Sequence, residues 1–195
     1  MRKKEEIATK PEAKKKILVY GVGNPGRQDD GLGPAFIFAL EKKKIPGLTM
    51  EADYQLQVED AILFSEHEAC VIVDALKTGK EPFTFKKIRP VKNFSFTTHA
   101  VSPNAVGYLC RTLYRKSPEI YILGIRGYDF EVGEDLSSKA RQNLKEALSF
   151  FVTILKNVTS DRKISAIIKI LIEKNLKKRK ERKSHGKKQK RSSGA

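Results

Sequence analysis

The chain has 195 residues, of which 39% are hydrophobic, and a formal net charge of +16. This length fits one domain of ordinary size with extensions, and the hydrophobic fraction is large enough for a packed core. A charge this high is typical of nucleic-acid binders, but residues 17–160 contain eighteen basic and seventeen acidic residues. Because the middle of the chain is nearly neutral, any contact with nucleic acid is expected to be accessory to the main activity.

The basic excess lies at the two ends of the chain. Residues 1–16 contain seven basic and three acidic residues, and residues 161–195 contain fourteen and three. We therefore expect a basic N-terminal arm at residues 1–16, one domain at residues 17–158, and an amphipathic helix with a basic, disordered tail at residues 159–195. The tail would either solubilise the protein or contact an acidic protein surface or nucleic-acid phosphates.

The two cysteines, Cys70 and Cys110, lie in apolar surroundings. Buried free thiols in a reducing compartment are the simplest interpretation. The charged first residues lack the apolar segment of a signal peptide, and no apolar run approaches the roughly 18 residues that a membrane helix needs. We therefore expect a cytoplasmic protein without membrane insertion.

Short apolar runs alternate with segments of helical periodicity along the domain. In chain order the pattern predicts strands and helices at residues 17–20 (strand), 34–40 (helix), 48–54 (strand), 58–64 (helix), 69–74 (strand), 81–88 and 93–96 (extended), 103–115 (helix), 119–125 (strand) and 137–155 (helix). Ser137 is expected to cap the last helix. Such alternation predicts an α/β fold, a three-layer αβα sandwich whose mostly parallel, twisted sheet is flanked by helices.

The rest of the chain is organised around the stretch from Ile17 to Pro34. It reads as a buried strand, a glycine-rich loop and a helix that opens near Pro34. Two adjacent carboxylates, Asp29 and Asp30, lie at the exit of the loop. In folds of this class, ligands bind at the carboxyl ends of the strands, so we expect the activity at this place.

One alternative takes the glycine loop as a dinucleotide-binding fingerprint. The glycines within 21–26 have its spacing, and Glu51 or Asp53 would stand in for the later acidic residue. In that motif, however, a pyrophosphate lies on the helix N-terminus. Asp29 and Asp30 would repel it, which disfavours this interpretation.

A second alternative comes from the sequence Gly-Asn-Pro-Gly at 23–26, which resembles the opening of peptidyl-tRNA hydrolases. A basic protein that acts on tRNA would explain the charged ends. That family has Thr-Arg-His-Asn shortly downstream, whereas this chain has Arg-Gln-Asp-Asp at 27–30 and no histidine before His67. The likeness is therefore better explained by a shared fold than by a shared reaction.

The third interpretation combines Asp30, Asp74 and His99. Asp30 opens the first helix, Asp74 ends the third strand and His99 follows an extended segment, so all three could meet at one edge of the sheet. Two carboxylates and an imidazole suit a divalent first-row metal, nickel included. Taken singly, these residues could be an N-cap, a turn former and a surface histidine. His67 is most simply in a solvated turn, and His185 in the basic tail has no obvious partner.

At these positions the chain resembles the maturation endopeptidases of nickel–iron hydrogenases, over about residues 16–156. The matching segments read GVGN with DDGLGP (21–24 and 29–34), VIVDA (71–75), THAVSP (98–103), and LGIRG with GEDLS (123–127 and 133–137). Four segments in the right order are more specific than any single glycine motif.

The resemblance implies a phosphorylase/hydrolase-like fold and an aspartyl-type endopeptidase. Such enzymes remove a C-terminal extension from the hydrogenase large-subunit precursor after nickel insertion. Their catalytic, nickel-contacting positions fall on Asp30, Asp74 and His99, and the substrate delivers the nickel, so no permanent cofactor is implied. The metal would polarise the scissile carbonyl or a water, and Asp29 or Asp30 would accept the proton. The alternative from a different class is a nickel-sensing or escort module without protease activity.

Removal of residues 177–195 should leave the thermal midpoint nearly unchanged, because a segment so rich in lysine and arginine buries little apolar surface. Calorimetry of the full and truncated chains checks this. A drop of many degrees on truncation would show that the tail is part of the folded domain.

Overall fold

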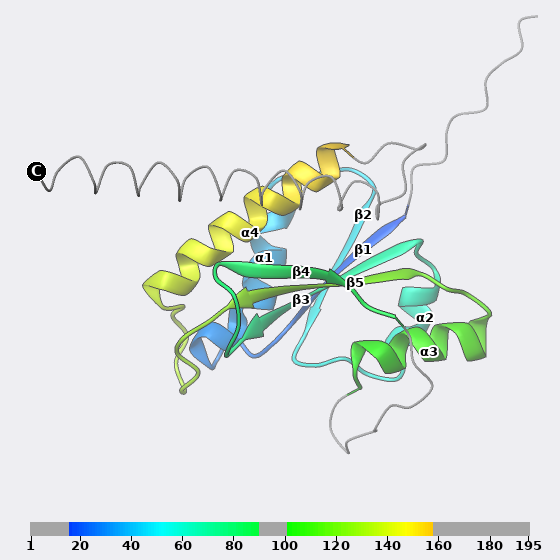
Figure 1. Ribbon diagram of the computed structural model, residues 1–195, viewed down its shortest axis with the longest axis horizontal. Coiled ribbons are helices and arrows are strands. Elements are labelled where there is room, and N and C mark those ends of the chain that lie inside the picture. Colours follow the sequence, from blue (N-terminus) through cyan, green and yellow to red (C-terminus); the bar gives the residue numbers. More distant parts are fainter. Residues whose placement is uncertain (1–15, 90–100, 158–195) are drawn as a thin grey trace, which may run out of the picture.

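The computed structural model describes residues 16–89 and 101–157 (Figure 1). The expectations for the N-terminal arm, for the extended segment at 93–96, and for the helix and tail at 159–195 lie outside the described residues. Within the part described, the chain alternates strands and helices as expected.

Five strands form one sheet in the order β2-β1-β3-β5-β4. Their bounds are Ile17–Val22 (β1), Leu48–Asp53 (β2), Ala69–Leu76 (β3), Phe83–Lys87 (β4) and Glu119–Arg126 (β5). All neighbouring pairs are parallel except β4 and β5, which are antiparallel. The three central strands are nearly continuous apolar runs, as expected for strands covered on both faces.

Helices cover both faces of this sheet (Figure 1). Their bounds are Leu32–Glu41 (α1), Asp60–Ser65 (α2), Pro103–Tyr114 (α3) and Ser138–Asn157 (α4). α1 and α4 pack on one face, and α2 and α3 on the other. The predicted three-layer αβα fold is thereby confirmed. No helix among the described residues is both long and apolar enough to span a bilayer.

Most elements begin or end within a few residues of the sequence-based expectation, and two of the shifted boundaries bear on the site. α1 begins at Leu32 rather than Pro34, directly after a 3-10 turn, η1 (Gln28–Gly31). Proline is tolerated there because backbone N–H groups in the first helical turn have no acceptor within the helix. β3 continues past Asp74 to Leu76, because residues 74–76 remain paired with β5. Asp74 therefore lies inside the strand rather than at its end.

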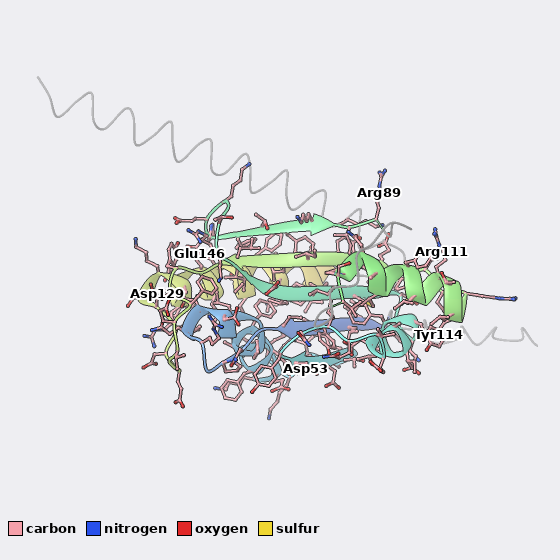
Figure 2. All side chains as sticks on the ribbon, turned by 90° about the horizontal axis from the view of Figure 1, so that it is seen from below. Asp53, Arg89, Arg111, Tyr114, Asp129 and Glu146 are labelled. Carbon is pink, nitrogen blue, oxygen red and sulfur yellow. The ribbon has the colours of Figure 1, made fainter. Side chains whose placement is uncertain are left out.

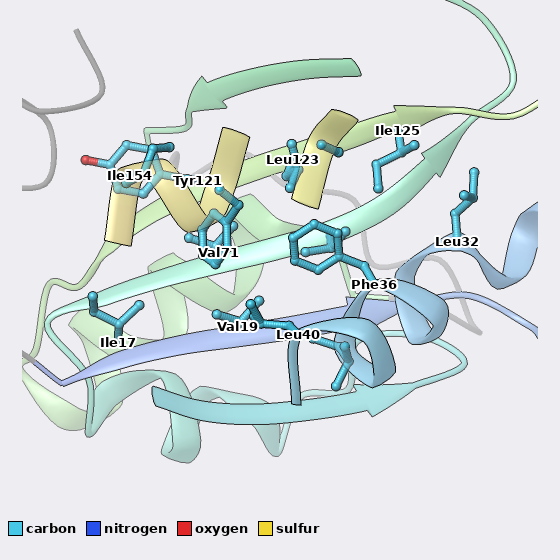
Figure 3. Packing of buried hydrophobic residues seen from close by; sticks show 14 of the residues in the cluster. Ile17, Val19, Leu32, Phe36, Leu40, Val71, Tyr121, Leu123, Ile125 and Ile154 are labelled. Atoms are coloured by element: carbon cyan, nitrogen blue, oxygen red, sulfur yellow. The ribbon is translucent and has the colours of Figure 1, made fainter. Parts of the chain in front are cut away.

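The first core lies between the sheet and the layer of α1 and α4 (Figure 3). Alternate residues of β1, Ile17 and Val19, face this layer, as the two-residue period of a strand requires. Phe36 of α1 meets Phe151 of α4 edge to face, with 5.6 Å between ring centroids. Burying a side chain of this size contributes roughly 2–3 kcal/mol, so these residues fix both helices on the sheet.

The second core lies on the opposite face, where Leu18 and Tyr20 of β1 pack against α2 and α3. Cys70 and Cys110 lie in this core as buried free thiols, as the sequence predicted. Burial raises the pKa of the Cys110 thiol to about 11, so it is protonated and unreactive at neutral pH.

The interpretation of His67 as part of a solvated turn is wrong. Its side chain is buried, with Nδ1 2.7 Å from the Leu63 carbonyl oxygen and Nε2 2.7 Å from the Thr49 hydroxyl. The imidazole thus joins α2 to β2. Its acidic sequence neighbours, Glu66 and Glu68, are exposed and gave no sign of this contact.

The start of α1 lies directly against β1 and β3 where the pairing of these two strands ends. A Cβ atom at Gly33 would lie 2.2 Å from the Val22 carbonyl oxygen and 2.6 Å from that of Val73. Real Cβ atoms essentially never approach backbone so closely. Glycine at this position therefore lets the helix approach the sheet and brings η1 to the strand ends.

Gly33→Ala should destabilise the protein by about 2 kcal/mol or more, because the added methyl group meets backbone atoms that cannot rotate away. Gly26→Ala is the matched control, since its Cβ would meet only the Asn24 side chain, at 3.2 Å. It should change stability by less than about 0.5 kcal/mol. Urea denaturation measures both, and equal effects would contradict the close-contact argument.

Candidate functional site

The candidate site lies where the parallel strands β1 and β3 stop pairing. Their ladder ends at the pair Gly21 and Val73, after which β1 leads into the glycine loop. Asp129, three residues after the end of β5, lies at the same end of the molecule, whereas Arg111 and Tyr114 of α3 lie at the opposite end (Figure 2). The carboxyl ends of the strands, the loop and η1 therefore share one edge, as expected for sites in this fold class.

Asp74 is the first residue of β3 beyond its ladder with β1. Its side chain is partly buried, and its Oδ1 accepts a hydrogen bond of 2.7 Å from the N–H of Ala75. Burial raises the pKa of Asp74 to about 6 despite that hydrogen bond, and the negative charge of Asp30 adds to the increase. The two predicted site carboxylates are thus close enough to repel each other.

Asp30 reaches the site from η1, which contacts β3. Its Oδ2 accepts a hydrogen bond of 3.1 Å from the N–H of Asn24, which closes the loop on itself. Gly23 allows this closure, because it has a φ of +138° and a Cβ there would lie 1.9 Å from the Asp30 carbonyl oxygen. The glycine loop is therefore folded tightly against the turn that carries Asp30.

His99 lies outside the described residues, so its predicted meeting with Asp30 and Asp74 stays a prediction. The described chain resumes at Val101, whose N–H donates to the Leu56 carbonyl oxygen at 3.2 Å. The even-numbered residues of β3, Cys70 and Ile72, belong to the same core as Val101. By the alternation of a strand, Asp74 therefore faces the layer in which the chain resumes after His99.

Asp30 and Asp74 could supply two oxygen ligands to a metal ion. Among the described residues, no group of three or more histidine, cysteine, aspartate or glutamate side chains is arranged to hold one. A complete ligand set would therefore need a third group, from His99 or from a molecule that brings its own metal. The second arrangement is the substrate-delivered metal that the family resemblance implies, and it stays a prediction.

Asp29 has a different role from the proton acceptor that the sequence left open. Its side chain is completely buried, and it accepts four hydrogen bonds of 2.7–3.0 Å, from the N–H groups of Tyr128 and Asp129 and from the N–H and hydroxyl of Ser137. Burial alone would raise the pKa of Asp29, but these hydrogen bonds outweigh it and lower the pKa. With no accessible face, Asp29 cannot take a proton from water at the site.

No family model matches the chain. A curated protein of Methanocaldococcus jannaschii, named "Putative hydrogenase maturation protease", is 27% identical over 157 residues, which cover 73% of this chain and 98% of that protein.

Solved structures share the fold. The [NiFe] hydrogenase maturation protease HycI from Thermococcus kodakarensis matches with a TM-score of 0.60 and 21% identity, covering 74% of this chain and 94% of that chain. The hydrogenase maturating endopeptidase HybD from E. coli matches with a TM-score of 0.57 and 19% identity, covering 72% and 92%. The chain is thus similar to hydrogenase maturation proteases in sequence and in fold, which confirms the resemblance that its motifs predicted.

Proposed function

We propose that this protein is an endopeptidase that removes the C-terminal extension of a nickel–iron hydrogenase large-subunit precursor after nickel insertion. The peptidase class is supported by the names of its relatives, which are proteases and endopeptidases of hydrogenase maturation. The observation that carries the proposal is the placement of Asp30 and Asp74 together at the sheet edge, within the fold of those enzymes. Both residues lie in the segments whose sequence resembles the family.

In this proposal Asp30, Asp74 and His99 contact the nickel of the substrate. The proximity of β3 and η1, which carry the two carboxylates, would suit a cation, because a divalent ion would offset both negative charges. The metal would supply Lewis-acid activation of the scissile carbonyl or of a water. Asp30, which has an accessible face, would accept the proton of the water.

The requirement for nickel follows if the protein supplies only Asp30, Asp74 and His99, because the precursor must then provide the other ligands of the metal. If the enzyme contributes only part of the coordination shell, a precursor without nickel cannot complete it and is bound weakly. The protein would then act only on large subunits whose metal site is loaded. Discrimination of this kind would delay cleavage until the metal is in place.

Asp30→Asn, Asp74→Asn and His99→Ala should each remain folded but process nickel-loaded precursor on the order of 10²-fold more slowly, with double variants little worse than single ones. Asparagine keeps the shape of the side chain but loses the charge that a divalent ion requires. The measurement is the mobility shift of the precursor, with thermal unfolding as the check on folding. The wild-type enzyme should leave nickel-free precursor uncut.

Asp53→Asn is the matched control for Asp74→Asn, because the Asp53 carboxylate also accepts the N–H of the following residue, at 2.6 Å, but is exposed on β2. It should process precursor at the wild-type rate. Normal processing by Asp74→Asn, or efficient cleavage of nickel-free precursor, would contradict metal recognition by this site. Binding of nickel-loaded precursor without any cleavage would instead identify the escort module.

Asp74→Asn should also stabilise the free protein at pH 7 and above, by about 1–2 kcal/mol. The pKa of Asp74 is raised from 3.8 to about 6 in the folded state, so ionisation disfavours folding. The stability contribution of the protonated carboxyl is complete below pH 3.8 and is lost as the pH rises through about 6.

Urea denaturation at several pH values measures this effect. The gain of Asp74→Asn over wild type should appear between pH 4 and 7 and vanish in more acidic buffer, while Asp53→Asn should show little change throughout. If the difference in stability between Asp74→Asn and wild type did not depend on pH, the raised pKa of Asp74 would be contradicted.

A further inference from the structure

The buried carboxylate of Asp29 accepts a set of hydrogen bonds that plays no part in the proposed reaction. Its two oxygens receive four hydrogen bonds, all from the segment between β5 and α4: Tyr128 and Asp129 donate N–H groups to Oδ2, Ser137 donates its N–H to Oδ1, and the Ser137 hydroxyl donates to Oδ2. An ionised carboxylate is rarely buried completely unless every acceptor site is filled. Here the donors come from residues about one hundred positions away along the chain.

The backbone around Asp29 follows the same path. The N–H groups of Gln28 and Asp29 donate to the carbonyl oxygens of Gly133 and Asp129, at 2.7 and 2.9 Å, and the N–H of Gly133 returns to Gly26, at 3.0 Å. Main-chain hydrogen bonds therefore join residues 26–29 to the 127–137 segment, and the Asp29 carboxylate adds side-chain hydrogen bonds to the same segment.

The turn needs such an anchor because its backbone is unusual. Gln28 has a φ of +46°, in the left-handed region that non-glycine residues seldom adopt. A residue held in this region persists only when its surroundings fix it. The bonds to the 127–137 segment supply that constraint directly before Asp30.

Within the part of the chain that the structure describes, the Asp30 side chain is held from within its own loop. Its carboxylate accepts a hydrogen bond from the N–H of Asn24, within the same loop. The position of the Asp30 side chain therefore depends on the backbone of η1, and η1 depends on its anchorage through Asp29.

We infer that Asp29 is a positioning residue, which fixes η1 on the 127–137 segment and so presents the Asp30 carboxylate at the sheet edge. The inference rests on the proposed function for its effect on processing, but the anchorage is a property of the free protein. The segment between β5 and α4 is thereby part of the catalytic framework, although none of its residues needs to touch the substrate.

The first experiment measures amide hydrogen exchange of the free protein. Asp29→Asn replaces one acceptor oxygen by an NH₂ group that faces N–H donors, so it cannot accept all four bonds. Exchange in residues 24–31 and 127–137 should accelerate about tenfold or more, while the strands of the central sheet keep their protection.

Ser137→Ala is the milder second variant, because it removes the hydroxyl bond but leaves the N–H groups. It should accelerate exchange in 24–31 by a few-fold, in the same direction. Since Ser137 also caps α4 by accepting the N–H of Ala140 at 3.3 Å, Ser102→Ala is the control for loss of a cap. Ser102 accepts the N–H of Ala105 at 3.2 Å at the start of α3, so its loss should leave residues 24–31 unaffected.

The second experiment is a double-mutant cycle on the single-turnover kcat/KM for nickel-loaded precursor. Asp29→Asn alone should lower kcat/KM about tenfold or more, but on the Asp30→Asn background it should change kcat/KM by less than about twofold, because the group that it positions is already lost. Asp60→Asn is the control: this carboxylate also accepts one hydroxyl and one N–H, from Tyr20 and Gln57, but anchors α2. It should process precursor like wild type.

Unchanged exchange in residues 24–31 of Asp29→Asn and Ser137→Ala would overturn the anchorage. Faster exchange with wild-type kcat/KM, or the same loss of kcat/KM on both backgrounds, would overturn the positioning role. If Asp29→Asn does not fold, Ser137→Ala decides both measurements. A wild-type protein that cleaves no precursor would refute the proposed function instead. The exchange experiment would still test whether Asp29 fixes η1 on the 127–137 segment.

Discussion

The geometry of the site depends on one buried charge. Asp29 lies completely inside the protein, and its carboxylate is stabilised by four hydrogen bonds from the 127–137 segment. Hydrogen bonds to a charged group are worth about 1.5–3 kcal/mol each, and a lost partner leaves the burial penalty unopposed. This contact joins the first loop of the chain to the entrance of α4, so it fixes the turn beside β3.

Three aspartates of this region show how environment divides one residue type into separate roles. Asp29 has many donors and no solvent, and its pKa is lowered. Asp74 is partly buried with one donor and a like charge nearby, and its pKa is raised to about 6. Asp53 ends the neighbouring strand on the surface, where its carboxylate accepts the N–H of Tyr54. Asp29 stabilises the structure, whereas Asp74 places a carboxyl group without a cationic partner among the described residues at the sheet edge.

The fold could be predicted from the sequence because its signals are local. Apolar runs of strand length, helical periodicity, the glycine loop and the Ser137 cap each report on a few neighbouring residues, and Ser137 does cap α4. The role of Asp29 could not be predicted, since its partners lie about one hundred residues away. The contact of His67 Nε2 with Thr49 could not be predicted either, because 18 residues separate the two. Asp29 and Asp30 look equivalent in the sequence. Only the contact with the 127–137 segment separates the anchor from the accessible carboxylate.

The same contact brings together segments that resemble the protease family but are widely spaced in the sequence. The glycine loop and the GEDLS stretch at 133–137 are far apart in sequence, yet Gly133 and Ser137 bond directly to residues 26–29. Asp74 in the VIVDA stretch lies on β3, which contacts η1, and is close enough to Asp30 to feel its charge. Three of the four segments therefore converge on η1 from the loop, from β3 and from the entrance of α4. A short turn held on several sides can keep two like charges close together, because it cannot move away to relieve their repulsion.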